Sequence, residues 1–575
     1  MQNPTVDEMV LERARTWLSN DFDTATRDTV RNMIESDPKE LTECFYKELE
    51  FGTGGMRGLM GVGTNRINRY TLGMASQGYA NFLKKKFPIG EINVAIAHDS
   101  RNYSKEFSRE VAGVFAANGI KVFLFEDLRP TPELSFAIRH LNCQGGAVLT
   151  ASHNPKEYNG FKVYGDDGGQ LVPPEDKQVI DEIRKVELGD VLFDGPESLI
   201  EVIGSEVDEA YLRQLKTLSR NKEGRKDLKV VFTALHGTGA VLLPDAFRDW
   251  GFDLTVIDEQ MIPDGNFPTV ISPNPEEAAA LDMAVRKAEE LGADMVIGND
   301  PDADRVGIAV KDDQGRMRLL NGNQTAIVLF YYLLMQDKKA GKLKGREFIA
   351  KTIVTTDLLD VIAEHFGVSC RNCYTGFKWI AEMIRENEGI NRFIVGGEES
   401  YGYLIGDFVR DKDAIGSALI LAEIAAWAKS KGSSFYQMLL DIYTQFGLFQ
   451  ERTISLTRKG KAGSEEIARM MEDLRSAPPT QLDGEKIIAI RDYRSGQTLN
   501  PITRTTETIP LTASNVIQLE TYEGTKLTAR PSGTEPKIKF YISVRSSVKD
   551  TSGLKQLEIQ LNQKIDRIVD QLDLR

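Results

Sequence analysis

Short apolar runs alternate with longer mixed stretches through roughly the first 450 residues of the chain. Residues 92–97, 121–125 and 145–149 are apolar runs of strand length. The stretch 104–119 ends at a glycine, as helices often do, and a further helix is expected to open at Pro132. Strands that alternate with helices predict βαβ units, in which mostly parallel sheets are covered by helices.

The same alternation recurs twice further along the chain. The expected elements are strands at 229–235, 254–257 and 294–298 with a helix near 241–250, and then strands at 348–355 and 392–396 with a helix over 357–366. Two further α/β domains are therefore expected to follow the first.

After about residue 450 the helices between strands disappear. Strands without intervening helices are expected at 486–493, 516–522, 526–533 and 537–544. One long helix follows, because the apolar positions from Leu554 to Leu572 step by three or four residues and mark one buried face. This order of strands followed by one helix predicts a smaller α+β domain at the C-terminus.

These patterns together predict an α/β protein with three α/β domains, each with a mixed, mostly parallel sheet, and a smaller α+β C-terminal domain. The length of 575 residues agrees, since single cores rarely grow beyond about 250–300 residues. The predicted domains are 1–200, which includes a helical N-terminal extension, 201–318, 319–448 and 449–575.

Composition and charge narrow the possible partners and location. The formal net charge is −14 and no long basic run occurs, so nucleic acid is not an expected partner. Apolar runs stay short of the roughly 20 residues that cross a bilayer, and the N-terminus lacks a signal-peptide core. A cytoplasmic protein without membrane contact is expected. Four cysteines do not make a disulfide framework.

The first chemical motif is a serine placed just after a buried strand. Ser152 follows the apolar run 145–149, and loop signals come after it at Asn154-Pro155 and in a turn expected at 158–160. Sheets of α/β proteins hold reactive groups at such strand ends. A polar turn that happens to contain a serine would look the same, so the motif needs support from others.

The second motif is Asp300-Pro-Asp302-Ala-Asp304-Arg305, directly after an apolar strand. We expect an extended loop, in which carboxylates at alternate positions point to one side. Three oxygen donors at one point suit Mg²⁺ or Ca²⁺. A calcium-binding helix–loop–helix is excluded, because its sixth and twelfth positions would hold Arg305 and Lys311 instead of glycine and glutamate.

Two further loops carry groups that suit a phosphorylated sugar. Residues 396–402 (GGEESYG) combine carboxylates and a hydroxyl, which suits sugar hydroxyls, although a polar hairpin would look alike. Residues 530–534 (RPSGT) offer a guanidinium, two hydroxyls and glycine-freed backbone N–H groups, which suit a phosphate.

Taken in this order and at these separations, the four motifs resemble those of the α-D-phosphohexomutases, the phosphoglucomutase/phosphomannomutase superfamily. The resemblance runs from about Phe51 to Tyr541. It implies an enzyme in which four domains surround a central cleft and each gives it one loop. It also implies a phosphosugar mutase that interconverts glucose 1-phosphate and glucose 6-phosphate through a phosphoserine, with glucose 1,6-bisphosphate as intermediate and activator.

The resemblance implies a role for each motif residue. Ser152 would be the phosphoserine, and its phosphoryl oxygen would hold Mg²⁺. The other metal ligands that it implies are Asp300, Asp302 and Asp304. The remaining catalytic residues that it implies are Lys162, Arg57 and Arg305. Lys162 would transfer a proton, which requires a lowered pKa. The implied substrate-binding residues are His153, Thr375, Gly376, Lys378, Glu398, Ser400, Lys412, Arg530, Ser532, Gly533 and Thr534.

The preferred sugar stays open at this point. Gly-Glu-Glu-Ser at 397–400 resembles glucose-preferring members, whereas 375–380 (TGFKWI) with 51–58 (FGTGGMRG) resembles a branch that also holds phosphopentomutases and glucose-1,6-bisphosphate synthases. Phosphomannomutase activity is a further alternative. A non-catalytic sugar-phosphate sensor would have no use for Ser152 beside three carboxylates, and a phosphatase would not need the second phosphate loop. The oligomeric state, monomer or dimer, is not predicted.

Overall fold

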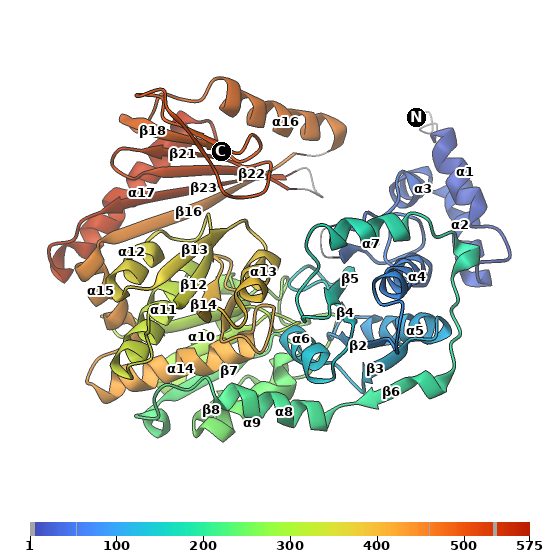
Figure 1. Cartoon of the computed structure of the whole chain (residues 1–575), viewed down its shortest axis with the longest axis horizontal. Helices are drawn as coiled ribbons and strands as arrows, with labels where there is room; N and C mark the ends of the chain where they lie inside the picture. Colours follow the sequence, from blue (N-terminus) through green and yellow to red (C-terminus); the bar gives the residue numbers. More distant parts are fainter. Residues whose placement is uncertain (1–5, 53–54, 459, 533–536) are drawn as a thin grey trace. The chain divides into compact units, whose positions relative to one another are not determined.

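The computed structural model describes residues 6–52, 55–458, 460–532 and 537–575, and the chain divides into two compact units (Figure 1). Unit 1 comprises residues 1–322 and 376–432, and unit 2 comprises residues 323–375 and 433–575. Within the described residues, no helix combines the length and the apolar character that a membrane span requires.

The N-terminal extension consists of three helices, α1 (Glu8–Thr16), α2 (Thr24–Ser36) and α3 (Pro38–Phe45). Aspartates cap all three, because Asp7, Asp23 and Asp37 each accept a hydrogen bond from a backbone N–H of the first turn. The helices share a core around Trp17, whose ring lies 4.5 Å from that of Phe22 and 5.5 Å from that of Tyr70. Tyr70 belongs to α4 (Arg69–Lys86), a helix of the first α/β region, so the extension covers this region.

The first sheet of unit 1 has the strand order β1-β5-β4-β2-β3-β6. Its strands are β1 (Gly55–Leu59), β2 (Asn93–His98), β3 (Lys121–Phe125), β4 (Gly145–Leu149), β5 (Tyr158–Gly165) and β6 (Ile200–Ile203). β4, β2, β3 and β6 run parallel, whereas β5 pairs antiparallel with both β4 and β1. The accompanying helices are α4 (Arg69–Lys86), α5 (Ser104–Ala117), α6 (Thr131–His140) and α7 (Glu175–Ile183).

The second sheet of unit 1 has the order β11-β10-β9-β7-β8. Its strands are β7 (Lys229–Thr233), β8 (Asp253–Val256), β9 (Met295–Asn299), β10 (Val306–Lys311) and β11 (Met317–Leu320), and its helices are α8 (Ser205–Lys216), α9 (Gly239–Trp250) and α10 (Ala278–Leu291). β7 pairs parallel with β8 and β9, and β9 forms an antiparallel hairpin with β10.

Unit 1 also contains the antiparallel pair β14 (Arg392–Gly397) and β15 (Tyr403–Ile405). Two helices accompany this pair, α13 (Phe377–Asn387) and α14 (Ala414–Ser430). α14 is buried on nearly every side and packs against β15 and α9. The turn between β14 and β15 carries the GEES motif predicted to bind sugar.

Unit 2 combines a parallel pair with an antiparallel sheet. β12 (Glu347–Thr352) and β13 (Ser369–Cys373) are parallel, with helices α11 (Gly322–Lys339), α12 (Leu358–Phe366) and α15 (Phe435–Phe446). The antiparallel sheet has the order β16-β23-β22-β21-β18-β19-β20, with β17 on β18. The strands of this sheet are β16 (Leu448–Thr457), β17 (Gln481–Leu482), β18 (Glu485–Asp492), β19 (Gln497–Leu499), β20 (Thr506–Thr508), β21 (Ile517–Thr521), β22 (Lys526–Pro531) and β23 (Lys537–Ser546). The helices that accompany it are α16 (Gly460–Ser476) and α17 (Leu554–Gln571).

The structure confirms the predicted fold class, with mixed sheets in the α/β regions and a β-rich C-terminal region. The turn expected at 158–160 is wrong, because these residues open β5 and pair with β1. Gly160 reads as a turn signal, but it is required here for close packing: a Cβ atom would lie 2.5 Å from the carbonyl oxygen of Thr150. The domain boundaries at 200, 318 and 448 stay predictions.

We expect Trp17→Ala to lower the free energy of unfolding of the region containing the extension by about 3–5 kcal/mol, the usual cost of truncating a buried Trp. The indole is 4 % exposed and contacts three aromatic rings. Urea denaturation followed by circular dichroism measures the change. Met9→Ala in the same extension is the control, because Met9 is 57 % exposed. Equal midpoints for both variants would show that the extension does not stabilise the first α/β region.

Candidate active site

Ser152 lies in the turn that follows β4, with only 3 % of its surface exposed. Its φ of 53° is in the left-handed region, which non-glycine residues adopt rarely and only with support from their surroundings. Its N–H donates to Thr150 Oγ1 (2.8 Å) and its Oγ donates to Asp300 Oδ2 (2.7 Å). The predicted serine and the predicted carboxylate loop therefore meet.

The three aspartates lie in the hairpin turn between β9 and β10. The expected extended loop is wrong: Ala303 has a φ of 50°, and its N–H donates to the carbonyl oxygen of Asp300, so the chain curls. Asp300 Oδ1 organises this turn by accepting from the N–H groups of Asp304 (3.1 Å) and Arg305 (2.9 Å). The carboxylates converge because the turn folds around one of them, and not because side chains alternate.

The donor set of this turn fits a hard divalent cation. One oxygen from each of Asp300, Asp302 and Asp304 lies within 4.8 Å of the others, and all three residues are buried. Asp302 Oδ1 and Asp304 Oδ1 have no hydrogen-bond partner among the described residues, although buried carboxylate oxygens are normally satisfied. A metal ion bound to these two oxygens would satisfy them. Burial and the neighbouring carboxylates raise the pKa of Asp300 well above its usual value.

Lys162 reaches the same carboxylates from β5. Its Nζ lies 2.8 Å from Asp302 Oδ2 and 3.5 Å from Asp304 Oδ2. Burial alone would lower its pKa, but the two carboxylates outweigh burial and raise it. In this arrangement Lys162 is a protonated ammonium, and the lowered pKa expected for proton transfer is not present.

Two further cationic side chains lie close to the carboxylate of Asp304. Lys412 Nζ lies 3.1 Å from Asp304 Oδ2, and Arg305 Nε lies 3.9 Å from Asp304 Oδ1. Burial alone would raise the pKa of Asp304, but Lys412, Lys162 and Arg305 outweigh it and hold that pKa below its usual value. Because oppositely charged groups surround it in a dry site, Asp304 stays ionised.

His153 and Arg57 flank the serine. His153 Nδ1 lies 3.0 Å from Ser152 Oγ, and Arg57 on β1 donates to Asn154 Oδ1 (3.1 Å). Burial, together with the charges of Arg305 and Arg57, holds the pKa of His153 well below its usual value. His153 is therefore a neutral imidazole near pH 7.

The residues predicted to bind sugar in unit 1 form a second group. Glu398 Oε1 accepts from the N–H of Gly376 (2.8 Å), and Lys378 Nζ lies 3.3 Å from Asp176 Oδ2. Burial, partly offset by Asp176, lowers the pKa of Lys378. Ser400 is half-buried in the turn between β14 and β15. Glu398 interacts electrostatically with Arg305 and Lys412, which links this group to the serine site.

The remaining predicted residues belong to unit 2. Thr375 follows β13, and its buried hydroxyl has no hydrogen-bond partner among the described residues. Arg530 lies on β22 opposite Lys539, and the N–H of Ser532 donates to the carbonyl oxygen of Lys537. Gly533 and Thr534 lie outside the described residues. The approach of these residues to Ser152 stays a prediction.

Sequence reasoning missed two carboxylates that hold the site cations. Glu276 Oε1 lies 2.5 Å from Arg305 Nη1, and Asp411 Oδ1 lies 3.0 Å from Lys412 Nζ. Asp411 stands next to Lys412 in the sequence and could have been suspected. Glu276 precedes Arg305 by 29 residues in an ordinary polar stretch, and no signal in the sequence points to it.

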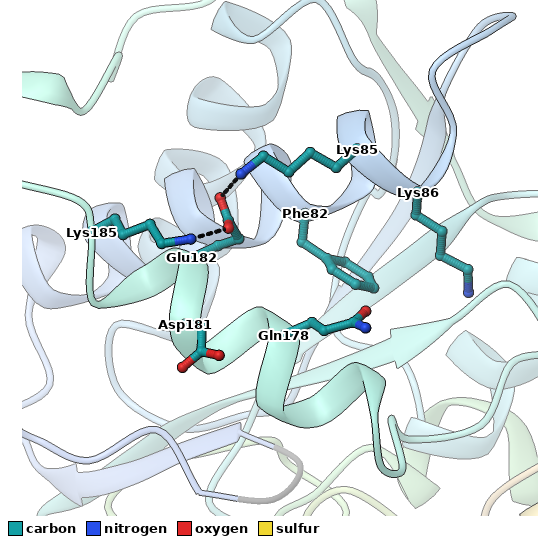
Figure 2. A pocket seen from close by; sticks show the side chains of 7 residues that line it. All are labelled: Phe82, Lys85, Lys86, Gln178, Asp181, Glu182 and Lys185. Atoms are coloured by element: carbon teal, nitrogen blue, oxygen red, sulfur yellow. Dashed lines mark hydrogen bonds and ion pairs between the residues drawn. The ribbon is translucent and has the colours of Figure 1, made fainter.

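A surface pocket of about 410 Å³ lies between α4 and α7, apart from these groups (Figure 2). Lys85 and Lys185 both contact Glu182 there, so two of its cations are already neutralised. None of its lining residues was predicted to act in the site, and we assign the pocket no role in it.

Three models of one protein family match the chain. They are described as the α/β/α domains I, II and III of phosphoglucomutase/phosphomannomutase, and they match residues 48–190, 209–315 and 321–446. Among curated proteins, the phosphoglucomutase of Staphylococcus epidermidis is 38% identical over 88% of this chain and 92% of its own. The phosphoglucomutase of Staphylococcus aureus (strain N315) is 38% identical over 88% of this chain and 91% of its own.

Solved structures show the same fold. A putative phosphomannomutase from Thermus thermophilus matches with a TM-score of 0.67 and 24% identity over 91% of this chain and 99% of its own. The open form of the Paramecium phosphoglucomutase parafusin matches with a TM-score of 0.66 and 18% identity over 91% of this chain and 96% of its own.

The serine beside a carboxylate cluster, set in successive α/β domains, defines the chain as an enzyme of the phosphotransferase and mutase class. It belongs to the phosphoglucomutase/phosphomannomutase family of the α-D-phosphohexomutase superfamily.

We expect Asp302→Asn to weaken binding of Mg²⁺ or Mn²⁺ on the order of 100-fold or more, because it removes one of three converging charges and one oxygen without a partner. Isothermal titration of the metal-free protein measures the affinity. Asp313→Asn removes the same charge from an exposed position in the β10–β11 turn and should change nothing. Equal metal affinity in the two variants would exclude the aspartate turn as the metal site.

Proposed function

We propose that the protein is a phosphoglucomutase that interconverts glucose 1-phosphate and glucose 6-phosphate through a phosphoserine at Ser152. The observation that carries the proposal is the 2.7 Å hydrogen bond from Ser152 Oγ to Asp300, since the hydroxyl then lies beside three converging carboxylates. The relatives named as phosphoglucomutases, 38% identical to this chain, support glucose as the sugar.

The proposed reaction has two half-reactions. In the first, the 6-hydroxyl of glucose 1-phosphate loses its proton and attacks the phosphorus of phosphoserine, while the bond from phosphorus to Ser152 Oγ breaks and Oγ takes up a proton. The product is glucose 1,6-bisphosphate, which we propose as intermediate and activator. After the bisphosphate turns round, Ser152 Oγ loses its proton and attacks the phosphorus of the C1 phosphate. The bond from that phosphorus to the sugar O1 breaks, O1 takes up a proton, and glucose 6-phosphate is released.

We assign charge stabilisation to Arg57 and Arg305 and proton transfer to Lys162. Mg²⁺ bound by the aspartate turn and a phosphoryl oxygen on Ser152 would neutralise charge on the transferring group. Lys162 would then feel less of the attraction to Asp302 and Asp304 that raises its pKa, as proton transfer requires.

We assign recognition of the sugar and of its second phosphate to the other predicted residues. Glu398 and Ser400 suit sugar hydroxyls, because a carboxylate accepts and a hydroxyl both donates and accepts. The residues assigned to ligand contacts are these two with His153, Thr375, Gly376, Lys378 and Lys412, and the second-phosphate loop is Arg530, Ser532, Gly533 and Thr534. We further propose four domains with boundaries near 200, 318 and 448, a small-molecule phosphosugar as substrate without nucleic-acid or membrane partners, and a cytoplasmic location.

In a mutase assay with glucose 1-phosphate, Mg²⁺ and a trace of glucose 1,6-bisphosphate, we expect Ser152→Ala to lose activity on the order of 10⁴-fold or more, because the nucleophile is gone. Ser108→Ala is the matched control, since Ser108 is a buried serine in α5 whose hydroxyl donates to a helix carbonyl. The intact mass should show one phosphoryl group on the wild type and none on Ser152→Ala.

The other outcomes separate the alternatives. Conversion of mannose, ribose or deoxyribose phosphates but not of glucose 1-phosphate would keep the site and change the sugar. An unphosphorylated wild type without turnover would favour a sugar-phosphate sensor. Undiminished activity of Ser152→Ala would contradict the proposal.

A further inference from the structure

A buried guanidinium lies beneath the Ser152 turn. Arg101 lies in the turn between β2 and α5, and its side chain is fully shielded from solvent. Its Nη2 donates to the carbonyl oxygens of Ser152 (2.7 Å) and Asn154, and its Nη1 donates to those of Pro155 (2.8 Å) and Tyr158 (3.0 Å). One side chain therefore binds four backbone carbonyls of a single seven-residue loop.

Arg101 is itself held in a fixed orientation. Its Nε lies 3.3 Å from Asp99 Oδ2, and its guanidinium lies over the ring of Phe267 at 5.1 Å from the centroid. Asp99 is fixed in turn, because its Oδ1 accepts from the N–H of Arg101 and from Ser104 Oγ. Both Nη atoms thus bind the loop, the ring of Phe267 covers one face of the guanidinium, and Nε makes an ion pair with Asp99 but no hydrogen bond among the described residues.

The loop needs such support because of the conformation of Ser152. A serine at a φ of 53° is strained and persists only where its surroundings impose this conformation. The hydrogen bonds from Arg101 act on the carbonyl of Ser152 itself and on carbonyls further along the loop. They leave the Oγ free to contact Asp300 and His153.

Arg101 and its neighbour Asn102 connect the serine loop to the turn at 264–267. Phe267 packs beneath the guanidinium, and Asn102 donates to Asn266 Oδ1 (3.1 Å). The approach is so close that a Cβ on Gly265 would lie 2.2 Å from the N atom of Asn102. The N–H of Asp264 donates to the carbonyl of His236, so the contact continues into the loop after β7.

The loop after β7 also supports the aspartate turn. Gly237 packs against Pro301 so closely that a Cβ on it would lie 2.3 Å from the Cα of Pro301. The N–H of Thr238 donates to the carbonyl of Pro301 (2.8 Å). Arg101 therefore lies where the supports of the nucleophile and of the carboxylates meet.

We infer that Arg101 is the positioning residue of the Ser152 nucleophile, an inference that rests on the proposed mutase function. In each turnover, Ser152 Oγ must first be the leaving group and then the nucleophile that attacks phosphorus. In both steps it must lie at the same place beside the carboxylate cluster. A displacement of about 1 Å can cost on the order of 10²-fold in rate. Arg101 fixes the loop through its carbonyls and does not contact the reacting atoms.

Lysine cannot replace this arginine. A lysine ammonium has three donors without a fixed plane, whereas the guanidinium provides five in a rigid fork. Arg101→Lys keeps the positive charge and loses the geometry, so it separates positioning from electrostatic stabilisation.

The chain offers a matched control in Arg225. Its guanidinium is also buried, donates to Trp250 O (2.9 Å) and Asn221 O (2.7 Å), pairs with Glu423, and lies over the ring of Trp250. These partners lie outside the serine loop. Arg225→Lys should therefore disturb a buried guanidinium of the same kind without moving the nucleophile.

The test measures kcat and KM of the phosphorylated holoenzyme with glucose 1-phosphate and Mg²⁺. We expect Arg101→Lys to lower kcat by about 100-fold with KM changed by less than about threefold, because only the chemical step needs the placed Oγ. Intact mass in a single turnover should show phosphoryl transfer from Ser152 slowed by the same factor. Arg225→Lys should keep the wild-type values in both measurements.

Chemical rescue gives a readout that a loss of stability cannot imitate. Methylguanidinium should partly restore kcat of Arg101→Ala, whereas sodium chloride at equal ionic strength should not, and Arg225→Ala should not respond to either. If Arg101→Ala does not fold, the lysine pair carries the test.

A wild-type kcat in Arg101→Lys, or equal losses in the two lysine variants, would overturn the inference while the mutase function stands. A wild type that converts no sugar phosphate would overturn the function and the inference with it.

Discussion

The site depends on keeping three carboxylates close together in a place that water does not reach. Oxygens of Asp300, Asp302 and Asp304 lie within 4.8 Å of one another, where like charges repel strongly because the surroundings are poorly polarisable. The protein opposes this repulsion with Lys162, Lys412 and Arg305, and the Ser152 hydroxyl donates to Asp300, whose pKa is raised well above its usual value.

Two of these cations, Lys162 and Lys412, come from distant parts of the sequence, and the fold brings them to the aspartate turn. Lys162 is carried by β5, an antiparallel addition to an otherwise parallel sheet, which returns the chain past the serine turn. Arg305 closes the aspartate turn itself, and Lys412 precedes α14. Arg305 and Lys412 each have a second carboxylate, Glu276 and Asp411. A phosphate bound at these cations, as we propose, would compete with carboxylates already in place, and this competition would ease its release.

The sequence predicted the parts of this site that local patterns encode. The apolar run before Ser152 and the alternating aspartates after another apolar strand identify both turns. Local patterns could not reveal the antiparallel strands, because 55–59 and 158–165 are rich in glycine and polar residues that read as loop signals. Nor could they reveal the curl at Ala303, which follows from hydrogen bonds to Asp300, or partners such as Arg101 and Glu276, which only the fold brings close.

The same curl explains how the start of α14 is fixed to the site. The carbonyl of Ala303 points outward from the aspartate turn and accepts from the N–H of Ala414 (3.2 Å) at the start of α14. Two residues earlier, Lys412 pairs with Asp304, so a backbone bond and an ion pair fasten the same segment. Because the Ser152 turn, the aspartate turn and this segment all belong to unit 1, the phosphoryl-transfer end of the site is assembled within one compact body. Preorganised charge of this kind needs little rearrangement when charge moves during the reaction.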